Sequence, residues 1–272
     1  MSRGERWEVV LLGDECGASK GVVLAAAAHP DDIEFMMAGT MVLLAQAGFE
    51  LHYLNIGNGS CGTAVHSREE IIAIRTEEAR EAARSIGAVF HPPYVDDIDI
   101  YYERTLLTKL GALVREVKPT ILLLQSPQDY MEDHQNSTRL MVSAAFCRGM
   151  RNFPTDPPRD PVADPVALYH ASPYGLCDQI CQPVRPDLYV DVSDVIGRKR
   201  DMLACHRSQK EWLDHSQGLD SYLITMTEMC AEVGRLSGRF EYAEGWRRHL
   251  HFGFSDEGFD PLTQALGAAV TP

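Results

Sequence analysis

The chain has 272 residues, of which 45% are hydrophobic and 24% are charged. This composition is ordinary for a folded protein of one large or two small domains, and it excludes disorder as the main state. The formal net charge is −14, from 25 Lys and Arg against 39 Asp and Glu, so we expect neither nucleic acid nor an anionic membrane surface as a partner.

From residue 21 onward, short apolar runs alternate with longer helical patterns, which indicates βαβ units and a parallel sheet. The sequence predicts strands over residues 21–28, 50–56, 88–95 and 119–125. It predicts helices over about residues 33–48, 67–86, 102–117 and 135–150. The second of these helices has a clear start, because Ser67 and Glu70 match a capping box.

The second half of the chain is less regular. Residues 154–165 contain five prolines in twelve positions, so this Pro-rich excursion is expected to be exposed, as an interface or a lid. Two further strands are expected over 166–172 and 187–193, followed by an amphipathic stripe of Leu219, Leu223, Met226, Cys230 and Val233. The tail after Asp256 is expected to fray. We therefore predict a single α/β domain over 1–272, with its core at about 21–250 and flexible ends.

The cellular compartment is indicated by two features. The first 20 residues have only a short apolar core between charged residues, and no apolar stretch approaches the roughly 20 residues of a membrane span. The seven cysteines (16, 61, 147, 177, 181, 205 and 230) are scattered, and the closest pair, Cys177 and Cys181, has no further zinc ligand of thiolate or imidazole type nearby. The sequence therefore predicts a soluble cytoplasmic protein with reduced thiols, no cleaved signal and no membrane span.

The expected strand order places polar residues at one crevice. Right-handed crossovers give the order 3-2-1-4-5, which predicts a Rossmann-like three-layer α/β sandwich with a mostly parallel sheet and an extra C-terminal region of helices and strands. The carboxyl ends of the first and fourth strands share the ligand-binding crevice of this fold. The runs HPDD (29–32) and DYMEDH (129–134) follow these two strands.

Each of these two runs also has a purely structural interpretation. Pro30 and Asp31 are typical of a helix start, and His134 is typical of a polar residue that opens a helix. Two imidazoles and several carboxylates at one crevice nevertheless favour a metal site with an open position, of the kind that suits Zn²⁺.

Several segments resemble the PIG-L/LmbE-type deacetylases, namely AHPDDIE (28–34), RTEEA (75–79), DYMEDH (129–134), CHRSQ (205–209) and YAEGWR (242–247). The resemblance spans about residues 21–250. Members of this family are zinc hydrolases that remove the acetyl group from N-acetylglucosamine-type amides. The resemblance implies that His29, Asp32 and His134 are the metal ligands and that Asp31 is the general base. Behind the ligands, Asp133 and Asp129 are expected to fix the imidazoles.

The chain departs from the family at Met131, where many members have a histidine that protonates the leaving amine or holds the oxyanion. A thioether can do neither. Either another group substitutes, with His249, His251, Glu132 and His66 as candidates, or the metal alone stabilises the tetrahedral intermediate. The departure bears on rate and mechanism more than on the class of reaction.

Two weaker signals concern ligand binding. The run GNGSCG (57–62) matches a dinucleotide fingerprint, but it follows the second strand and no helix starts directly after it, so we expect a flexible rim of the crevice and no NAD. Arg75 and Asp96 are expected to contact a hydroxyl-rich sugar. The alternative for each is a surface ion pair, which we expect of Asp97 more than of Asp96.

We predict zinc-dependent hydrolysis of the acetamide of an N-acetylglucosamine-type sugar or sugar conjugate, by metal-activated water with Asp31 as base. The expected partner is a small-molecule N-acetylated sugar, and family relatives suggest a homo-oligomer. The alternative is a non-catalytic Rossmann-like module that binds a sugar or nucleotide in the same crevice, with Met131 marking lost catalysis. The intact base and ligands favour the enzyme.

Overall fold

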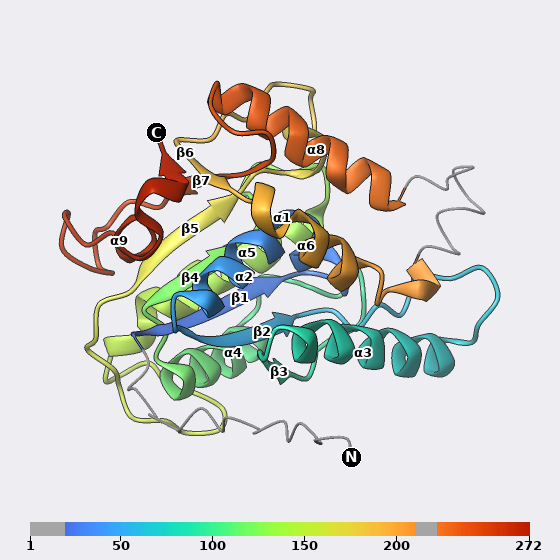
Figure 1. Ribbon diagram of the computed structural model, residues 1–272. Helices are drawn as coiled ribbons and strands as arrows, with labels where there is room; N and C mark the ends of the chain where they lie inside the picture. Colours follow the sequence, from blue (N-terminus) through green and yellow to red (C-terminus); the bar gives the residue numbers. More distant parts are fainter. Residues whose placement is uncertain (1–19, 210–221) are drawn as a thin grey trace, which may run out of the picture.

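The computed structural model describes residues 20–209 and 222–272 (Figure 1). The expectations for the N-terminal segment and for Leu219 lie outside the described residues. No helix in the described ranges combines the length and the apolar composition that a membrane span needs.

The centre of the fold is an eight-stranded sheet with the order β3-β2-β1-β4-β5-β7-β6-β8. The first five strands run parallel, in the predicted order 3-2-1-4-5. The other three extend the sheet with antiparallel pairings. The bounds are β1 Val22–Ala27, β2 Glu50–Asn55, β3 Val89–His91, β4 Ile121–Leu124, β5 Ala167–Ala171, β6 Leu188–Asp191, β7 Ala243–Arg248 and β8 Val270–Thr271.

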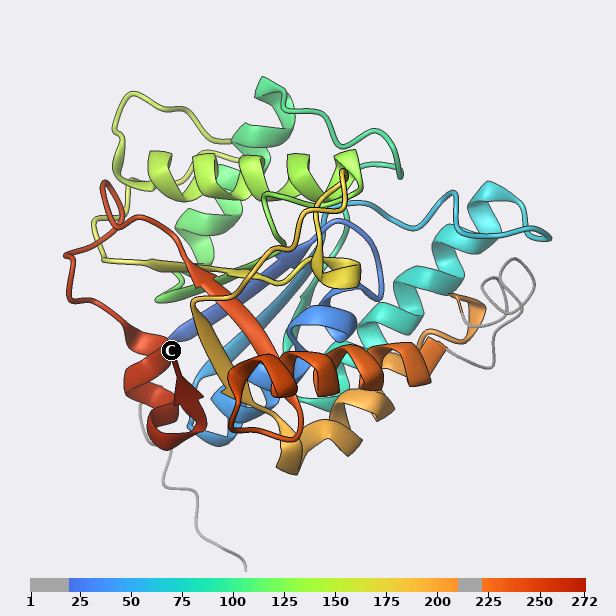
Figure 2. The same cartoon turned by 90° about the horizontal axis from the view of Figure 1, so that it is seen from above.

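Helices cover both faces of the sheet, which completes the predicted three-layer sandwich (Figure 2). One face is covered by α4 (Arg104–Val117) and α5 (Glu132–Phe146). The other face is covered chiefly by α1 (Asp32–Met36), α2 (Ala38–Gln46), α3 (Arg68–Ser85) and α6 (Ile196–Leu203), with α8 (Tyr222–Ser237) and α9 (Pro261–Leu266) nearby. Short 3-10 turns span Cys147–Gly149, Tyr174–Leu176, Ser193–Val195 and Gly267–Ala269.

The central strands divide their side chains between the two cores. In β1, Val23 and Ala25 pack in the core under α2, whereas Leu24 and Ala26 pack in the core under α4 and α5. Successive side chains of a strand point to opposite faces, so a strand covered on both faces must be apolar throughout. This double burial explains why the continuous apolar runs identified the central strands.

A local start signal explains where α3 begins. Ser67 accepts the backbone N–H of Glu70, and the Glu70 carboxylate accepts the N–H of Ser67, so the predicted capping box forms at the start of α3.

The single helix expected over about 33–48 is divided at Met37 into α1 and α2. Met37 lies outside helical dihedrals, with a φ of −133°.

The expectation that the tail after Asp256 frays is wrong. Asp260 caps α9 and accepts a hydrogen bond of 2.5 Å from the buried Tyr169 hydroxyl. Leu262 is fully buried in the core, and β8 pairs with β6. The tail is therefore fixed by one apolar anchor and one buried polar contact.

The Pro-rich excursion carries no helix or strand and is exposed except at a few positions such as Thr155 and Val162. It connects the end of α5 to the start of β5, so it lies at the amino-terminal edge of the parallel strands. The crevice lies at the opposite edge. The excursion is therefore not placed to act as a lid over the crevice.

Candidate metal centre

The segments that follow β1 and β4 at their carboxyl ends position the two histidines. His29 follows β1 by two residues, and its backbone N–H donates to the Asp32 carboxylate at 2.7 Å. The turn is completed by Asp31, whose φ of 102° lies in the left-handed region and ends the extended chain before α1. His134 is the third residue of α5, and its helix begins soon after β4 ends.

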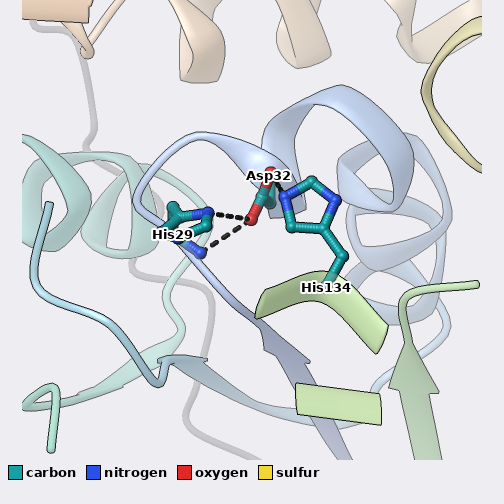
Figure 3. Close-up of side chains that lie close together, drawn as sticks. All are labelled: His29, Asp32 and His134. Atoms are coloured by element: carbon teal, nitrogen blue, oxygen red, sulfur yellow. Dashed lines mark hydrogen bonds and ion pairs between the residues drawn. The ribbon is translucent and has the colours of Figure 1, made fainter. Parts of the chain in front are cut away.

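The structure brings His29, Asp32 and His134 together, with one possible ligand atom of each lying within 4.8 Å of the others (Figure 3). Asp32 stands between the two imidazoles, 3.5 Å from Nδ1 of His29 and 3.4 Å from Nε2 of His134. Both histidines are buried. Two imidazole nitrogens and one carboxylate form a ligand set suited to a divalent metal with an open position.

The other nitrogen of each imidazole is held by its own carboxylate. Nε2 of His29 lies 2.9 Å from Asp133, which also accepts the backbone N–H of Ile98 at 2.7 Å. Nδ1 of His134 lies 2.9 Å from Asp129. These carboxylates fix which nitrogen faces Asp32, as partners behind metal ligands commonly do.

The electrostatics of this cluster favour positive charge. Burial alone would lower the pKa of His29, but hydrogen bonds to Asp133 and Asp32 raise it to about 10. Burial also opposes a raised pKa of His134, yet Asp32 and Asp129 raise it. The pKa of Asp32 is lowered because the two histidines outweigh its burial. The carboxylates therefore stabilise a cation between these side chains, whether it is a proton or a metal ion.

Asp31 stands next to this cluster but turns to other partners. Its carboxylate accepts a hydrogen bond of 2.6 Å from the Tyr222 hydroxyl and lies 3.7 Å from the Arg75 guanidinium. Burial raises the pKa of Asp31, against the opposing charge of Arg75. Asp31 is thus a carboxylate beside the candidate metal site whose hydrogen-bond and ion-pair partners among the described residues are Tyr222 and Arg75 and not the two histidines, so its oxygens are placed as those of a general base would be.

Arg75 and Asp96 occupy different environments. Arg75 is only 3% exposed, donates to the Pro30 carbonyl at 2.6 Å and lines the cavity, so it is not a surface ion pair. A Cβ at Gly59 or Gly62 would contact the Arg75 side chain too closely, which favours glycine at these two positions of the 57–62 loop. Asp96 instead pairs with Arg68 and Asn58 near the surface.

The structure corrects the expected order of Asp96 and Asp97. Asp96 is not among the described residues that line the cavity, whereas Asp97 lines it and is buried. Asp97 accepts the backbone N–H groups of Gly59 and Cys61, which fixes the 57–62 loop against the crevice. The sequence could not distinguish two adjacent aspartates that differ only in their partners and in whether they line the cavity.

None of the four candidates for the missing acid lines the cavity in the described part of the chain. His249 is hydrogen-bonded to His170 at 2.9 Å and borders a separate hollow beside α5. The other three candidates, His66, Glu132 and His251, also lie outside the described cavity. Met131 itself lines the cavity, so no histidine occupies its place.

Two glutamates of the motifs, Glu34 and Glu244, hold the helices that carry the site. Glu34 is fully buried, accepts the Tyr53 hydroxyl at 3.0 Å and lies 3.2 Å from Nε2 of His206. The carboxylate of Glu244 accepts the N–H groups at the start of α2 and pairs with Lys199 at 2.6 Å. The later motifs therefore hold α1 and α2 in place, a role that sequence reasoning missed.

Residues 24–145 match the PIG-L family model, described as GlcNAc-PI de-N-acetylase. The chain is 29% identical over 238 residues to a diacetylchitobiose deacetylase of Thermococcus kodakarensis, covering 83% of this chain and 82% of that protein.

Two solved structures share the fold. An N,N'-diacetylchitobiose deacetylase from Pyrococcus horikoshii superposes with a TM-score of 0.71 at 23% identity, covering 89% of this chain and 88% of that one. A 4-carboxy-2-hydroxymuconate hydratase from Pseudomonas putida superposes with a TM-score of 0.70 at 21% identity, covering 85% and 96%. At these identities the two structures show the architecture alone.

Proposed function

Because the chain belongs to the PIG-L/LmbE family of deacetylases, we propose that it hydrolyses the acetamide of an N-acetylglucosamine-type sugar or sugar conjugate. One observation carries the proposal. Two imidazoles, each fixed by its own carboxylate, converge with Asp32 beside the separate base Asp31. The proposed ligands are His29, Asp32 and His134, and the proposed metal is Zn²⁺.

The metal supplies polarisation of the amide carbonyl and acidification of the attacking water. Asp31 accepts the proton of that water as the new C–O bond forms at the amide carbon. The C–N bond then breaks, and the same proton passes from Asp31 to the leaving nitrogen. This double use of one carboxylate accounts for a cavity in which Met131 offers no acid and no described histidine replaces it.

Two side chains orient Asp31 for this task. The Tyr222 hydroxyl donates to one carboxylate oxygen, and Arg75 faces the other. Arg75 is proposed to act on the substrate through Asp31 and the rim loop, because its guanidinium already donates to Pro30 and approaches Asp97. The sugar hydroxyls are proposed to meet Asp97 in place of Asp96.

The cellular compartment and the oligomeric state are also proposals. The cysteines of the described residues are free, which supports a reducing, cytoplasmic compartment. A homo-oligomer stays a prediction from the family resemblance.

The test measures metal content and amine release together. Purified protein should hold one zinc ion per chain and release free amine from N-acetylglucosamine or N,N'-diacetylchitobiose, and His134→Ala should lose both properties. Asp96→Asn, which removes a carboxylate near the surface, serves as control and should keep both. Stoichiometric zinc without amine release from any N-acetylated sugar would favour a binding module or a hydratase instead.

A further inference from the structure

The cavity beside the proposed metal centre has an aromatic wall. The ring of Tyr130 lies edge-on to His134 with centroids 5.5 Å apart, and Tyr174 follows at 6.1 Å from Tyr130. Phe35 continues the run at 5.8 Å from Tyr174. These residues come from the β4–α5 loop, the β5–β6 connection and α1, so three separate segments build one continuous wall.

Part of this wall is open to solvent. Tyr130 is 56% exposed and Tyr174 is 40% exposed, although both line the cavity. The cavity has a volume of about 650 Å³, well within the range of small-molecule sites. Exposed ring faces at the mouth of a polar site are favourable contacts for a flat apolar surface, which would displace water from them. The wall therefore indicates a ligand with an apolar face at some distance from the reacting amide.

The charges in the cavity indicate the same class of ligand. Its lining includes four carboxylates, those of Asp31, Asp32, Asp97 and Asp129. Arg75 is the one Lys or Arg among the described lining residues, and it is engaged by the Pro30 carbonyl and two of these carboxylates. Away from the proposed metal, a phosphate or carboxylate on the ligand would find no unpaired cation among the described lining residues and would lie near carboxylates of the same charge.

We propose that the preferred substrates are amino sugars whose substituent beyond the N-acetylated ring is uncharged and presents a flat apolar face to Phe35 and Tyr174. An aryl group and the C–H face of a second pyranose share this chemistry. The inference rests on the proposed deacetylase function and names the substrate class of that same site.

The test compares three substrates: N-acetylglucosamine, its phenyl β-glycoside and its 1-phosphate. The phenyl glycoside should have the highest kcat/KM, at least about tenfold above the 1-phosphate. In Tyr174→Ala the preference for the phenyl glycoside over the free sugar should fall about tenfold, mainly through KM, a factor equivalent to about 1.4 kcal/mol. Phe252→Ala removes an exposed ring outside this cavity and should leave the preference unchanged.

A binding measurement separates this inference from the deacetylase proposal. Calorimetric titration with phenyl β-glucosaminide, the amine product, should show about tenfold weaker binding to Tyr174→Ala and to Tyr174→Leu, with melting temperatures confirming that both variants fold. Equal kcat/KM for the phenyl glycoside and the 1-phosphate would overturn the aglycone inference while leaving deacetylation intact. Equal losses of kcat/KM on all three substrates in Tyr174→Ala would do the same. Absence of amine release, with Tyr174-dependent binding retained, would overturn the deacetylase proposal alone.

Discussion

Replacing Asp129 with Asn removes the negative charge behind His134 while keeping the shape of the side chain. The contact spans 2.9 Å between Asp129 and Nδ1 of His134, and both groups are buried. A hydrogen bond to a charged group contributes about 1.5–3 kcal/mol, against about 0.5–1.5 kcal/mol for a neutral one, so the loss is about 1–1.5 kcal/mol. The zinc affinity of Asp129→Asn should therefore fall about tenfold, at the lower end of the range for residues behind metal ligands.

Competition with a chromogenic zinc chelator measures this change directly. Asp133→Asn provides the equivalent loss behind His29 and should weaken zinc binding by a similar factor. Asp96→Asn is the matched control, because it removes the same charge from a carboxylate that pairs with Arg68 near the surface. If Asp129→Asn and Asp133→Asn bind zinc as tightly as the wild type and the Asp96→Asn control, the carboxylates do not orient the ligands, and the proposed arrangement of the site is wrong.

Asp31→Asn should keep its zinc and lose turnover on the order of 10²–10⁴-fold, and near-normal turnover at full zinc occupancy would place the base elsewhere. The folded-state pKa of His29 is raised to about 10 from 6.5, so its contribution to the stability of the metal-free protein is complete below pH 6.5 and lost as pH rises toward 10. The urea midpoint of the metal-free protein should accordingly fall across that range, and a rise would refute the assigned contacts. Lys199→Met leaves the buried Glu244 carboxylate without its cation and should cost about 3 kcal/mol in urea unfolding, whereas an unchanged midpoint would show that the ion pair is dispensable. Met131→Ala should lower turnover less than about tenfold, because lost packing is its only expected effect, and a larger loss would show that the thioether shapes the substrate pocket.

The order of the parallel strands could be predicted because two local signals determine it. Double burial makes β1 and β4 continuously apolar, and the right-handed crossover rule then places them side by side. Residues that follow these strands meet at one crevice, so the convergence of the HPDD and DYMEDH runs follows from sequence and topology, whereas the choice of His29, Asp32 and His134 as a ligand set came from the family resemblance.

Strand β7 of the antiparallel extension could not be predicted in the same way, whereas the strand expected over 187–193 corresponds to β6. β7 contains Glu244 and Arg247, so it lacks the apolar pattern of a buried strand. Glu244 is nevertheless buried, because Lys199 and the backbone of Gly39 and Thr40 satisfy its carboxylate. A strand that depends on a partner 45 residues away carries no local signal.

Two tyrosines of the cavity could not be identified from the sequence for the same reason. Tyr222 and Tyr174 are far from Asp31 and His134 in sequence, and only the packing of α8 and the β5–β6 connection brings them to the crevice. No periodicity orients a loop tyrosine toward a metal site. Asp97 likewise required the structure, since its neighbour Asp96 offers the same chemistry one position earlier.

The central claim is that metal bound by the His29, Asp32 and His134 set enables hydrolysis of an acetamide. Its most direct test follows acetate and free amine by NMR while the phenyl β-glycoside of N-acetylglucosamine is incubated with chelator-treated protein, before and after one equivalent of Zn²⁺ is added. We expect no reaction before the addition and equal amounts of acetate and amine after it. Acetate release that does not respond to zinc, or no release from the zinc-loaded protein, would contradict the account.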